Sequence, residues 1–208
     1  MNKDIRTEIY ARLREKMPQP TTELHYADPF ELLISVILSA QATDVSVNKA
    51  TTKLFPIANT PKSLLDLGVP KLKGYIKTIG LYNNKAENII KTCRLLLEHF
   101  DGQVPRTRDA LESLPGVGRK TANCVLGEIY NVPSMVIDTH MIRIMGLLNF
   151  TKTKDAKQIE LDMMEIFDKK DWVNLTHLVI DHGRAVCIAR RPQCGDCVLV
   201  DICPSSSV

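Results

Sequence analysis

Several features that would direct an interpretation are absent from this sequence of 208 residues. It has no uninterrupted apolar run long enough to cross a bilayer, which argues against a membrane-spanning helix. The first ten residues, MNKDIRTEIY, carry charge and lack an apolar segment, so we expect no secretory signal. A soluble intracellular protein is therefore expected, which argues against disulfides between its six cysteines.

A strong charge of either sign is also missing. Lys and Arg number 27 against 24 Asp and Glu, which gives a net charge of +3 and a pI near 8.5. Many nucleic-acid-binding domains are more basic, so composition alone does not indicate DNA. With 44% hydrophobic and 25% charged residues, the chain is typical of globular proteins and long enough for one large domain or two small ones.

No stretch alternates apolar and polar residues, which is the pattern of a half-buried strand. Apolar residues instead recur at helical spacing nearly throughout, so we predict an all-α protein. The segment 29–40 is apolar on almost every side and should form a buried central helix. The expected helices are 2–16, 29–40, 44–54, 61–67, 69–78, 84–100, 107–114, 119–130, 139–148, 154–167 and 171–184.

The stretch LPGVGRKTANCVLGEIYNVPSMVIDTHMIR, residues 114–143, gives the strongest functional signal. It begins with a tight turn in which Gly116 and Gly118 permit positive φ and leave backbone N–H groups bare. A helix that begins near Arg119 adds the positive end of its dipole to these groups. The turn and the helix start therefore predict a site for a phosphate oxygen.

Segment lengths predict that Lys120 and Asp138 face one cleft. A helix over 119–130 is about 18 Å long, and the residues 131–137 span at most roughly 25 Å, enough to return Asp138 to the helix start. A lysine amine is uncharged in only about one molecule in 2,500 at pH 7, so burial or a nearby base must help to free it. Alternatively, Lys120 is a solvated charge and Asp138 an N-cap, a role compatible with catalysis.

Four of the cysteines follow the pattern Cys187-x6-Cys194-x2-Cys197-x5-Cys203. Four thiolates at this spacing can ligate one metal centre, for which zinc and an iron–sulfur cluster are the candidates. A redox enzyme is a further alternative, although the sequence has no dinucleotide-binding fingerprint. The two remaining cysteines, at positions 93 and 124, stand singly in helical patterns and are expected to be buried thiols.

The run Leu-Pro-Gly-Val-Gly-Arg-Lys-Thr-Ala, followed by Pro133 and Ile-Asp-Thr-His, resembles the helix-hairpin-helix, Gly/Pro-Asp superfamily of DNA glycosylases. Within it, the chain is similar to the endonuclease III family over essentially its whole length. The resemblance implies a two-lobed fold: a six-helix barrel, 22–132, ending in the hairpin motif at about 107–130, and a second lobe from 1–21 and 133–208. It also implies that the four clustered cysteines hold a [4Fe–4S] cluster rather than zinc.

The same resemblance implies removal of oxidised pyrimidines from double-stranded DNA by a monomeric enzyme. The amine of Lys120 would attack C1′ of a damaged nucleotide or abasic site, while Asp138 accepts a proton or stabilises positive charge on the sugar. The resulting Schiff base would lose the 3′ phosphate by β-elimination. Two alternatives stay open: a non-catalytic hairpin DNA-binding module, and a monofunctional glycosylase for a mispaired purine, which Lys120 and the lack of an appended recognition domain disfavour.

Base excision requires the target nucleotide to leave the base stack. By resemblance, Gln41 and Leu81 enter the duplex and His140 lies close to the active site. Leu81 follows Gly80 in a short break between helices, which independently suits an apolar wedge. The alternatives are that Leu81 caps a hydrophobic core and that His140 only supports the start of its helix.

The loop between the first two clustered cysteines contains Arg190 and Arg191, which are expected to meet phosphate or else to be solvated arginines. Two departures from the pattern of the family concern the same function. Gln193 stands where relatives often have a basic residue, and Gly146-Leu147 stands where they tend to have Asn-Arg. Both departures should weaken contacts to the DNA backbone without abolishing the chemistry.

Overall fold

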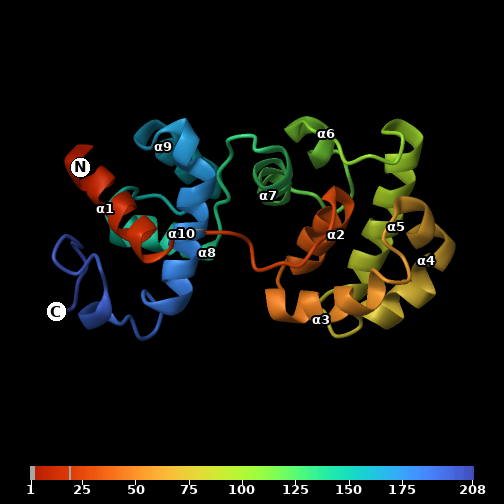
Figure 1. The fold of residues 1–208 in the computed structure, drawn as a ribbon, viewed down its shortest axis with the longest axis horizontal. Helices are drawn as coiled ribbons and strands as arrows, with labels where there is room; N and C mark the ends of the chain where they lie inside the picture. The colour runs from red at the N-terminus through yellow and green to blue at the C-terminus, as the bar shows by residue number, and fades with distance from the viewer. Residues whose placement is uncertain (1–2, 19) are drawn as a thin grey trace. The chain divides into compact units, whose positions relative to one another are not determined.

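Helices make up the regular secondary structure of the computed structural model, which describes residues 3–18 and 20–208 (Figure 1). No strand occurs in these residues, which confirms the all-α prediction. None of their helices is both long and apolar enough to cross a membrane. The elements are α1 Lys3–Lys16, α2 Pro29–Ser39, α3 Asp44–Leu54, α4 Pro61–Ile76, α5 Tyr82–His99, α6 Arg108–Glu112, α7 Arg119–Tyr130, α8 Thr139–Leu147, α9 Ala156–Ile166, η1 Lys169–Asp171, α10 Trp172–Ala185 and η2 Cys194–Asp196.

Contacts between residues divide the chain into two compact units. The first, Glu23–Val132, contains α2 to α7 and is called the hairpin unit. The second, Met1–Thr22 with Pro133–Val208, contains α1, α8, α9 and α10 and is called the cysteine unit. Each unit has a hydrophobic core of its own, so each is described separately.

The core of the hairpin unit is built around α2, whose residues 30–38 are all buried. An N-terminal capping arrangement starts this helix. Oδ1 of Asp28 accepts a hydrogen bond from the N–H of Glu31 at 2.9 Å, and Oε2 of Glu31 accepts one from the N–H of Ala27 at 2.7 Å. Helices α3, α5 and α7 pack against α2. The prediction of a buried central helix is therefore confirmed.

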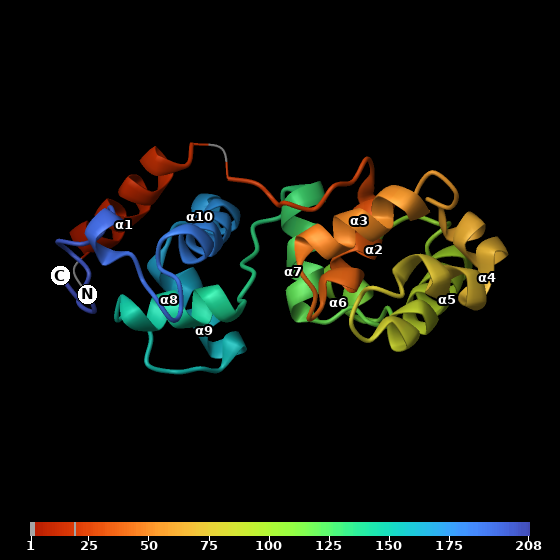
Figure 2. The same cartoon turned by 90° about the horizontal axis from the view of Figure 1, so that it is seen from below.

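Helices α4 and α5 lie side by side in the hairpin unit (Figure 2). The chain of α4 kinks at Gly68, which has a φ of +75°, so the expected break between 61–67 and 69–78 is present. The long helix α5 begins after Leu81, which has a left-handed φ of +60° and no side-chain cap. Thr107 precedes α6 at the N-cap position, but its side chain makes no capping hydrogen bond.

The cysteine unit joins the N-terminal helix to the C-terminal third of the chain. Ile9 and Leu13 of α1 are buried in the same core as the apolar residues of α8, α9 and α10. Helix α10 packs against both α1 and α8. The polypeptide therefore leaves this unit after α1, builds the whole hairpin unit, and returns to complete the core that α1 began.

Candidate active site and metal centre

The hairpin between α6 and α7 is held firmly on α5. Gly116 has a φ of +82°, and a Cβ at this position would lie 3.2 Å from Nδ2 of Asn88. The hydroxyl of Thr92 donates a hydrogen bond to the carbonyl oxygen of Pro115 at 3.0 Å. Of the two glycines that the sequence singled out, only Gly116 needs positive φ, because Gly118 has a φ of −97°. The close approach to α5 explains why a side chain is excluded from position 116.

The start of α7 leaves its first backbone N–H groups without a side-chain cap. Gly118 is the N-cap residue, it is exposed, and a Cβ placed on it would meet no atom within 4 Å. Uncapped N–H groups at the positive end of a helix favour an anion. The structure therefore provides the open helix start that the predicted phosphate site requires.

Lys120 is the second residue of α7, and its side chain is exposed. One turn further along the same helix, burial raises the pKa of the Cys124 thiol to about 12. The carboxylate of Glu128 raises this pKa further, whereas the positive charge of Lys120 lowers it. The amine of Lys120 thus stands at the surface of the hairpin unit, above a layer of buried and partly buried side chains.

Asp138 belongs to the cysteine unit and begins α8. Its Oδ1 accepts a hydrogen bond from the N–H of Met141 at 2.8 Å, so the predicted N-cap role is confirmed. The segment that leads to Asp138 is anchored to α10, because the N–H of Val136 donates to the hydroxyl of Thr176 at 3.3 Å. The orientation of the carboxylate is therefore fixed by its own helix and by the core of its own unit.

His140, in the first turn of α8, packs against Gly183 of α10. A Cβ on Gly183 would lie 2.7 Å from Nδ1 of His140, so this contact requires glycine. Nη2 of Arg143 lies 3.5 Å from Nδ1 of His140 and donates to the carbonyl oxygens of Gly183 at 3.2 Å and Cys187 at 2.6 Å. Arg143 therefore connects the helix that Asp138 caps with the first clustered cysteine. Its side chain was not singled out from the sequence, because no local pattern marks it.

Gln41 and Leu81 lie on one part of the hairpin unit. Both have left-handed backbone angles, with φ values of +55° and +60°, and both side chains are exposed. A Cβ on Gly80 would lie 3.6 Å from the carbonyl oxygen of Gln41, which shows that the two turns touch. Leu81 is 58% exposed, so the alternative that it caps a core does not hold.

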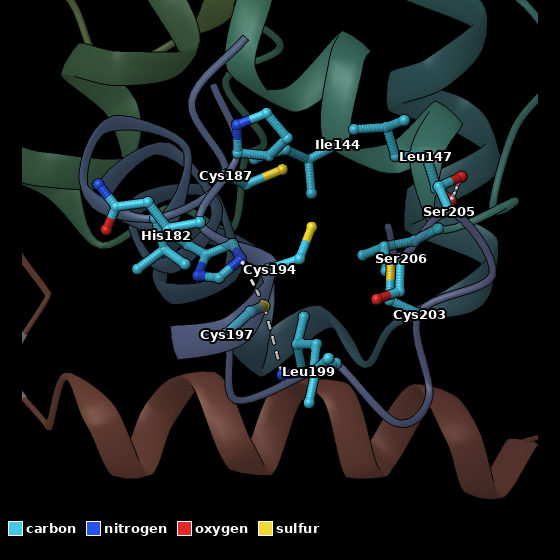
Figure 3. Close-up of a pocket in the computed structure, with 15 residues that line it drawn as sticks. Ile144, Leu147, His182, Cys187, Cys194, Cys197, Leu199, Cys203, Ser205 and Ser206 are labelled. Atoms are coloured by element: carbon cyan, nitrogen blue, oxygen red, sulfur yellow. Dashed lines mark hydrogen bonds between the residues drawn. The ribbon is translucent and has the colours of Figure 1, made fainter. Parts of the chain in front are cut away.

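The four clustered cysteines line one pocket of about 90 Å³ in the cysteine unit (Figure 3). Its other walls are mostly apolar and include Ile144 of α8 and Leu199. Sγ of Cys197 accepts a hydrogen bond from the N–H of Leu199 at 3.4 Å and lies 3.6 Å from Nε2 of His182. All four are free cysteines in the structure. The four cysteines that cluster in the sequence therefore surround one pocket in the structure.

The lining of the pocket fits the predicted cluster. The four thiols surround a common volume, as the ligands of a four-iron cluster do (Figure 3). N–H groups close to a ligating sulfur, such as that of Leu199, are a further feature of such centres.

The pKa values of the thiols differ across the pocket. Burial raises the pKa of Cys187 and of Cys197, whereas hydrogen bonds from Ser207 lower the pKa of Cys194. Because iron binds thiolate, assembly of a cluster has to displace protons from these two partly buried thiols. Arg190 and Arg191 lie in the exposed loop between the first two ligands, where both side chains face solvent.

The last turns of the chain are fastened to α1. The guanidinium group of Arg12 donates to the carbonyl oxygen of Val198 at 2.9 Å and to Oδ2 of Asp201 at 3.0 Å. The hydroxyl of Ser205 donates to the carbonyl oxygen of Leu147, at the end of α8, at 2.8 Å. These contacts hold the segment that carries Cys203 against two helices of the unit.

Comparison with known proteins gives consistent matches over the chain. Residues 34–169 match the family model of the HhH-GPD superfamily base excision DNA repair proteins. Residues 187–203 match the iron-sulfur binding domain of endonuclease III. The chain is 57% identical to endonuclease III of Escherichia coli strain K12 over 203 residues, which cover 98% of the chain and 96% of that protein. Identity to endonuclease III of Haemophilus influenzae is also 57%, with the same coverage.

Two solved structures extend the comparison to the fold. A trapped covalent intermediate of endonuclease III with DNA superimposes with a TM-score of 0.94 at 40% identity, and covers 99% of this chain and 97% of its own. A thermostable thymine-DNA glycosylase has a TM-score of 0.85 at 22% identity, over 97% and 96% of the two chains, which supports the fold alone. The two-lobed helix-hairpin-helix glycosylase fold is thereby established.

Proposed function

Because the chain belongs to the HhH-GPD superfamily and within it to the endonuclease III family, we propose that Lys120 and Asp138 carry out its base excision and strand cleavage. The protein is a DNA glycosylase that removes oxidised pyrimidines, with an associated abasic-site lyase activity. The proposal therefore concerns which residues of this chain perform a known reaction. Support comes from the exposed amine at the uncapped start of α7 and from the ordered carboxylate at the start of α8.

In the proposed reaction, the neutral amine of Lys120 attacks C1′ of the damaged nucleotide. A carbon–nitrogen bond forms to the lysine as the glycosidic bond breaks and the base leaves with its electron pair. The carboxylate of Asp138 accepts the proton that the amine gives up, or stabilises the positive charge that develops on the opening sugar ring. The C1′–O4′ bond then breaks and O4′ takes up a proton, so the sugar ring opens and leaves an iminium ion between Lys120 and C1′.

The lyase step follows from the same iminium ion. Its positive nitrogen acidifies the C2′ proton, and removal of this proton leads to cleavage of the C3′–O bond with departure of the 3′ phosphate. Water then hydrolyses the Schiff base and restores the lysine. An amine is required for this sequence, because a hydroxyl, thiol or water nucleophile cannot form an iminium ion with C1′.

The hairpin and the cluster loop provide the contacts to the DNA backbone in this proposal. The N–H groups around Gly116 and Gly118 receive a phosphate oxygen at the start of α7. The [4Fe–4S] cluster would be held by Cys187, Cys194, Cys197 and Cys203. Bound there, it would fix the conformation of the loop that contains these cysteines. Arg190 and Arg191 in this loop add positive charge toward phosphate.

The remaining functional assignments concern the wider context of the enzyme. DNA is the partner of the family in solved complexes, and we propose duplexes with damaged bases or abasic sites as its substrates. We further propose that residues 22–132 form the lobe that carries the amine, and that 1–21 with 133–208 form the lobe that carries the carboxylate and the cluster. The protein is proposed to act as a monomer, in the cytoplasm with the nucleoid.

The observation that carries the residue assignment is the hairpin Leu114–Gly118, which ends in the uncapped helix start beside Lys120. Sodium borohydride reduces a lysine–sugar Schiff base to a stable amine, so iron-replete protein and damaged duplex should give a covalent complex. Lys120→Gln should abolish this complex. Lys62→Gln is the matched control, because Lys62 is likewise the exposed second residue of a helix, α4. A complex formed by Lys120→Gln would overturn the assignment.

A further inference from the structure

A lysine is buried in the hairpin unit without an acidic partner. Lys85, in the first turn of α5, is 5% exposed. Its Nζ donates hydrogen bonds to the carbonyl oxygens of Leu38 at 2.8 Å and Ala40 at 2.6 Å. No ion pair of the described residues includes it, and burial lowers the pKa of its amine. The charge is therefore met by the carbonyl end of α2, where the helix dipole is negative.

A charged amine is not needed to fill the space that the Lys85 side chain occupies in the core. Burying an ammonium group carries a desolvation cost, and an apolar side chain of similar volume is often neutral or stabilising in its place. What the amine does here that an apolar side chain could not do is bind two carbonyl oxygens at the end of α2. Those carbonyls belong to the chain that leads directly into Gln41.

The two hydrogen bonds fix the turn that presents Gln41. This residue has a φ of +55°, a left-handed conformation that is strained for a residue with a Cβ. The turn closes through a hydrogen bond from the N–H of Ala42 to the carbonyl oxygen of Ser39 at 3.0 Å. Nζ of Lys85 binds the carbonyls on the preceding side of the turn. Hydrogen bonds therefore hold the backbone on both sides of Gln41.

The backbone of Lys85 contacts the second turn through the first hydrogen bond of α5. Its N–H donates to the carbonyl oxygen of Leu81 at 3.1 Å, in the first turn of α5. Leu81 also has a left-handed backbone, with a φ of +60°. One residue therefore connects, through its side chain and its main chain, the two exposed residues that are expected to enter the duplex.

We propose that Lys85 is a positioning residue that holds Gln41 and Leu81 as one rigid pair, so that both fill the gap left when the damaged nucleotide leaves the stack. The proposal rests on the assignment of Gln41 and Leu81 as the residues that enter the duplex. A rigid pair lowers the cost of ordering the two side chains at the moment of insertion. Lys85 therefore acts on extrusion of the nucleotide and leaves the chemistry at the amine of Lys120 unaffected.

Two substrates separate extrusion from chemistry. Excision of an oxidised pyrimidine from a duplex requires the gap to be filled, whereas the lyase reaction on an abasic site in single-stranded DNA does not. With the iron-replete full chain, Lys85→Met should lower kcat on the duplex at least about tenfold, because small misplacement of positioning groups has large effects on rate. Single-strand lyase activity should change less than about twofold. Lys91→Met is the matched control, an exposed lysine of the same helix.

A double-mutant cycle tests the connection to the pair. If Lys85 acts through Gln41 and Leu81, then Lys85→Met should add little to the loss caused by Gln41→Ala with Leu81→Ala. Lys85→Gln, whose side-chain amide can still donate hydrogen bonds, should restore part of the duplex activity and serves as the test variant if Lys85→Met does not fold. Equal losses on both substrates, full additivity, or wild-type kcat on the duplex would each overturn the proposal. Wild-type lyase activity on the single strand reports on Lys120 independently, so the two assignments can fail separately.

Discussion

Oδ1 of Asp138 accepts a hydrogen bond from the N–H of Met141 at 2.8 Å, and Oδ1 of Asp155 accepts one from the N–H of Gln158 at the same distance. Each aspartate is the N-cap residue of its helix, α8 or α9. The cysteine unit thus contains two aspartates with the same capping geometry, of which only Asp138 is proposed to be catalytic. The pair allows capping and chemistry to be separated by experiment.

The change Asp138→Asn keeps a capping side chain and removes its negative charge. Because Asn and Asp are comparable N-caps, the free energy of unfolding should change by less than about 1 kcal/mol. Base release from a lesion-containing duplex should fall by about 10² to 10⁴, the usual contribution of a positioned acid or base. Denaturant unfolding and a base-release assay measure the two effects. Asp155→Asn should alter neither, and wild-type base release by Asp138→Asn would refute the catalytic role.

A glycine substitution tests the hairpin. Gly116→Ala places a Cβ on a residue with a φ of +82°, at 3.2 to 3.3 Å from the side chain of Asn88. We expect a loss of about 1 to 2 kcal/mol in the free energy of unfolding, since left-handed backbone is costly for any residue with a Cβ. Gly74→Ala is the control, because Gly74 is helical and open, and should gain about 0.5 to 1 kcal/mol. Thermal and urea unfolding measure both.

The neighbouring glycine should behave differently, because a Cβ on Gly118 meets no protein atom within 4 Å. Gly118→Ala should therefore fold with a loss of only about 0.5 to 1 kcal/mol, while its Cβ would stand in the path of a phosphate at the start of α7. Fluorescence anisotropy with a labelled duplex should show weaker binding. Unchanged affinity would mean that the phosphate does not approach this helix start.

The hydrogen bonds from Arg12 of α1 to the segment that carries Cys203 should affect how firmly the cluster is held. Arg12→Met removes the bonds to Val198 and Asp201, which hold the segment that carries Cys203. The purified variant should lose iron to a chelator faster than the wild-type protein. Visible absorbance and iron analysis measure the rate of loss. Arg14→Met is the control, because Arg14 is an exposed arginine of the same helix. This variant should lose iron at the wild-type rate. Equal rates for Arg12→Met and the wild type would show that these hydrogen bonds do not protect the cluster.

Local sequence patterns predicted much of the fold and of the site. The predicted limits of two helices, 44–54 and 119–130, agree with those of α3 and α7. The spacing of Cys187, Cys194, Cys197 and Cys203 predicted that these thiols share one site, and they line a common pocket. Contacts between distant segments were not predictable in this way. The bond from Arg143 to the carbonyl oxygen of Cys187 joins residues 44 positions apart, and that from Arg12 to Asp201 joins residues 189 apart. No local pattern assigned a role to the side chain of either arginine.

The same distinction applies to the burial of single side chains. Lys85 lies in a charged, polar stretch, Asn84 to Glu87, whose helical pattern places its neighbour Ala86 in the core. A lysine beside that position would be expected to reach solvent. It is buried because α2 ends opposite it and offers two carbonyl oxygens, a relation that only the tertiary structure reveals.

Cys93 of α5 has no exposed surface, and burial raises the pKa of its thiol to about 12. An unfolded thiol ionises near pH 8.5, so the folded state binds the proton more tightly. The thiol therefore contributes stability that is fully present below about pH 8.5 and is lost as the pH rises toward about 12, with a limiting slope of about 1.4 kcal/mol per pH unit.

Comparison with Cys93→Ala isolates this contribution. At about pH 7 the variant should be less stable by about 1 to 2 kcal/mol, because the removed sulfur leaves a cavity. Between about pH 9 and pH 10 the wild-type protein loses stability through Cys93 and the variant does not, so the difference between them should shrink. Burial also raises the pKa of Cys124. This thiol is present in both proteins, so its contribution to the pH dependence cancels in the difference. Urea unfolding at a series of pH values measures the difference, and a difference that stays constant with pH would contradict the assignment of a protonated, buried thiol at position 93.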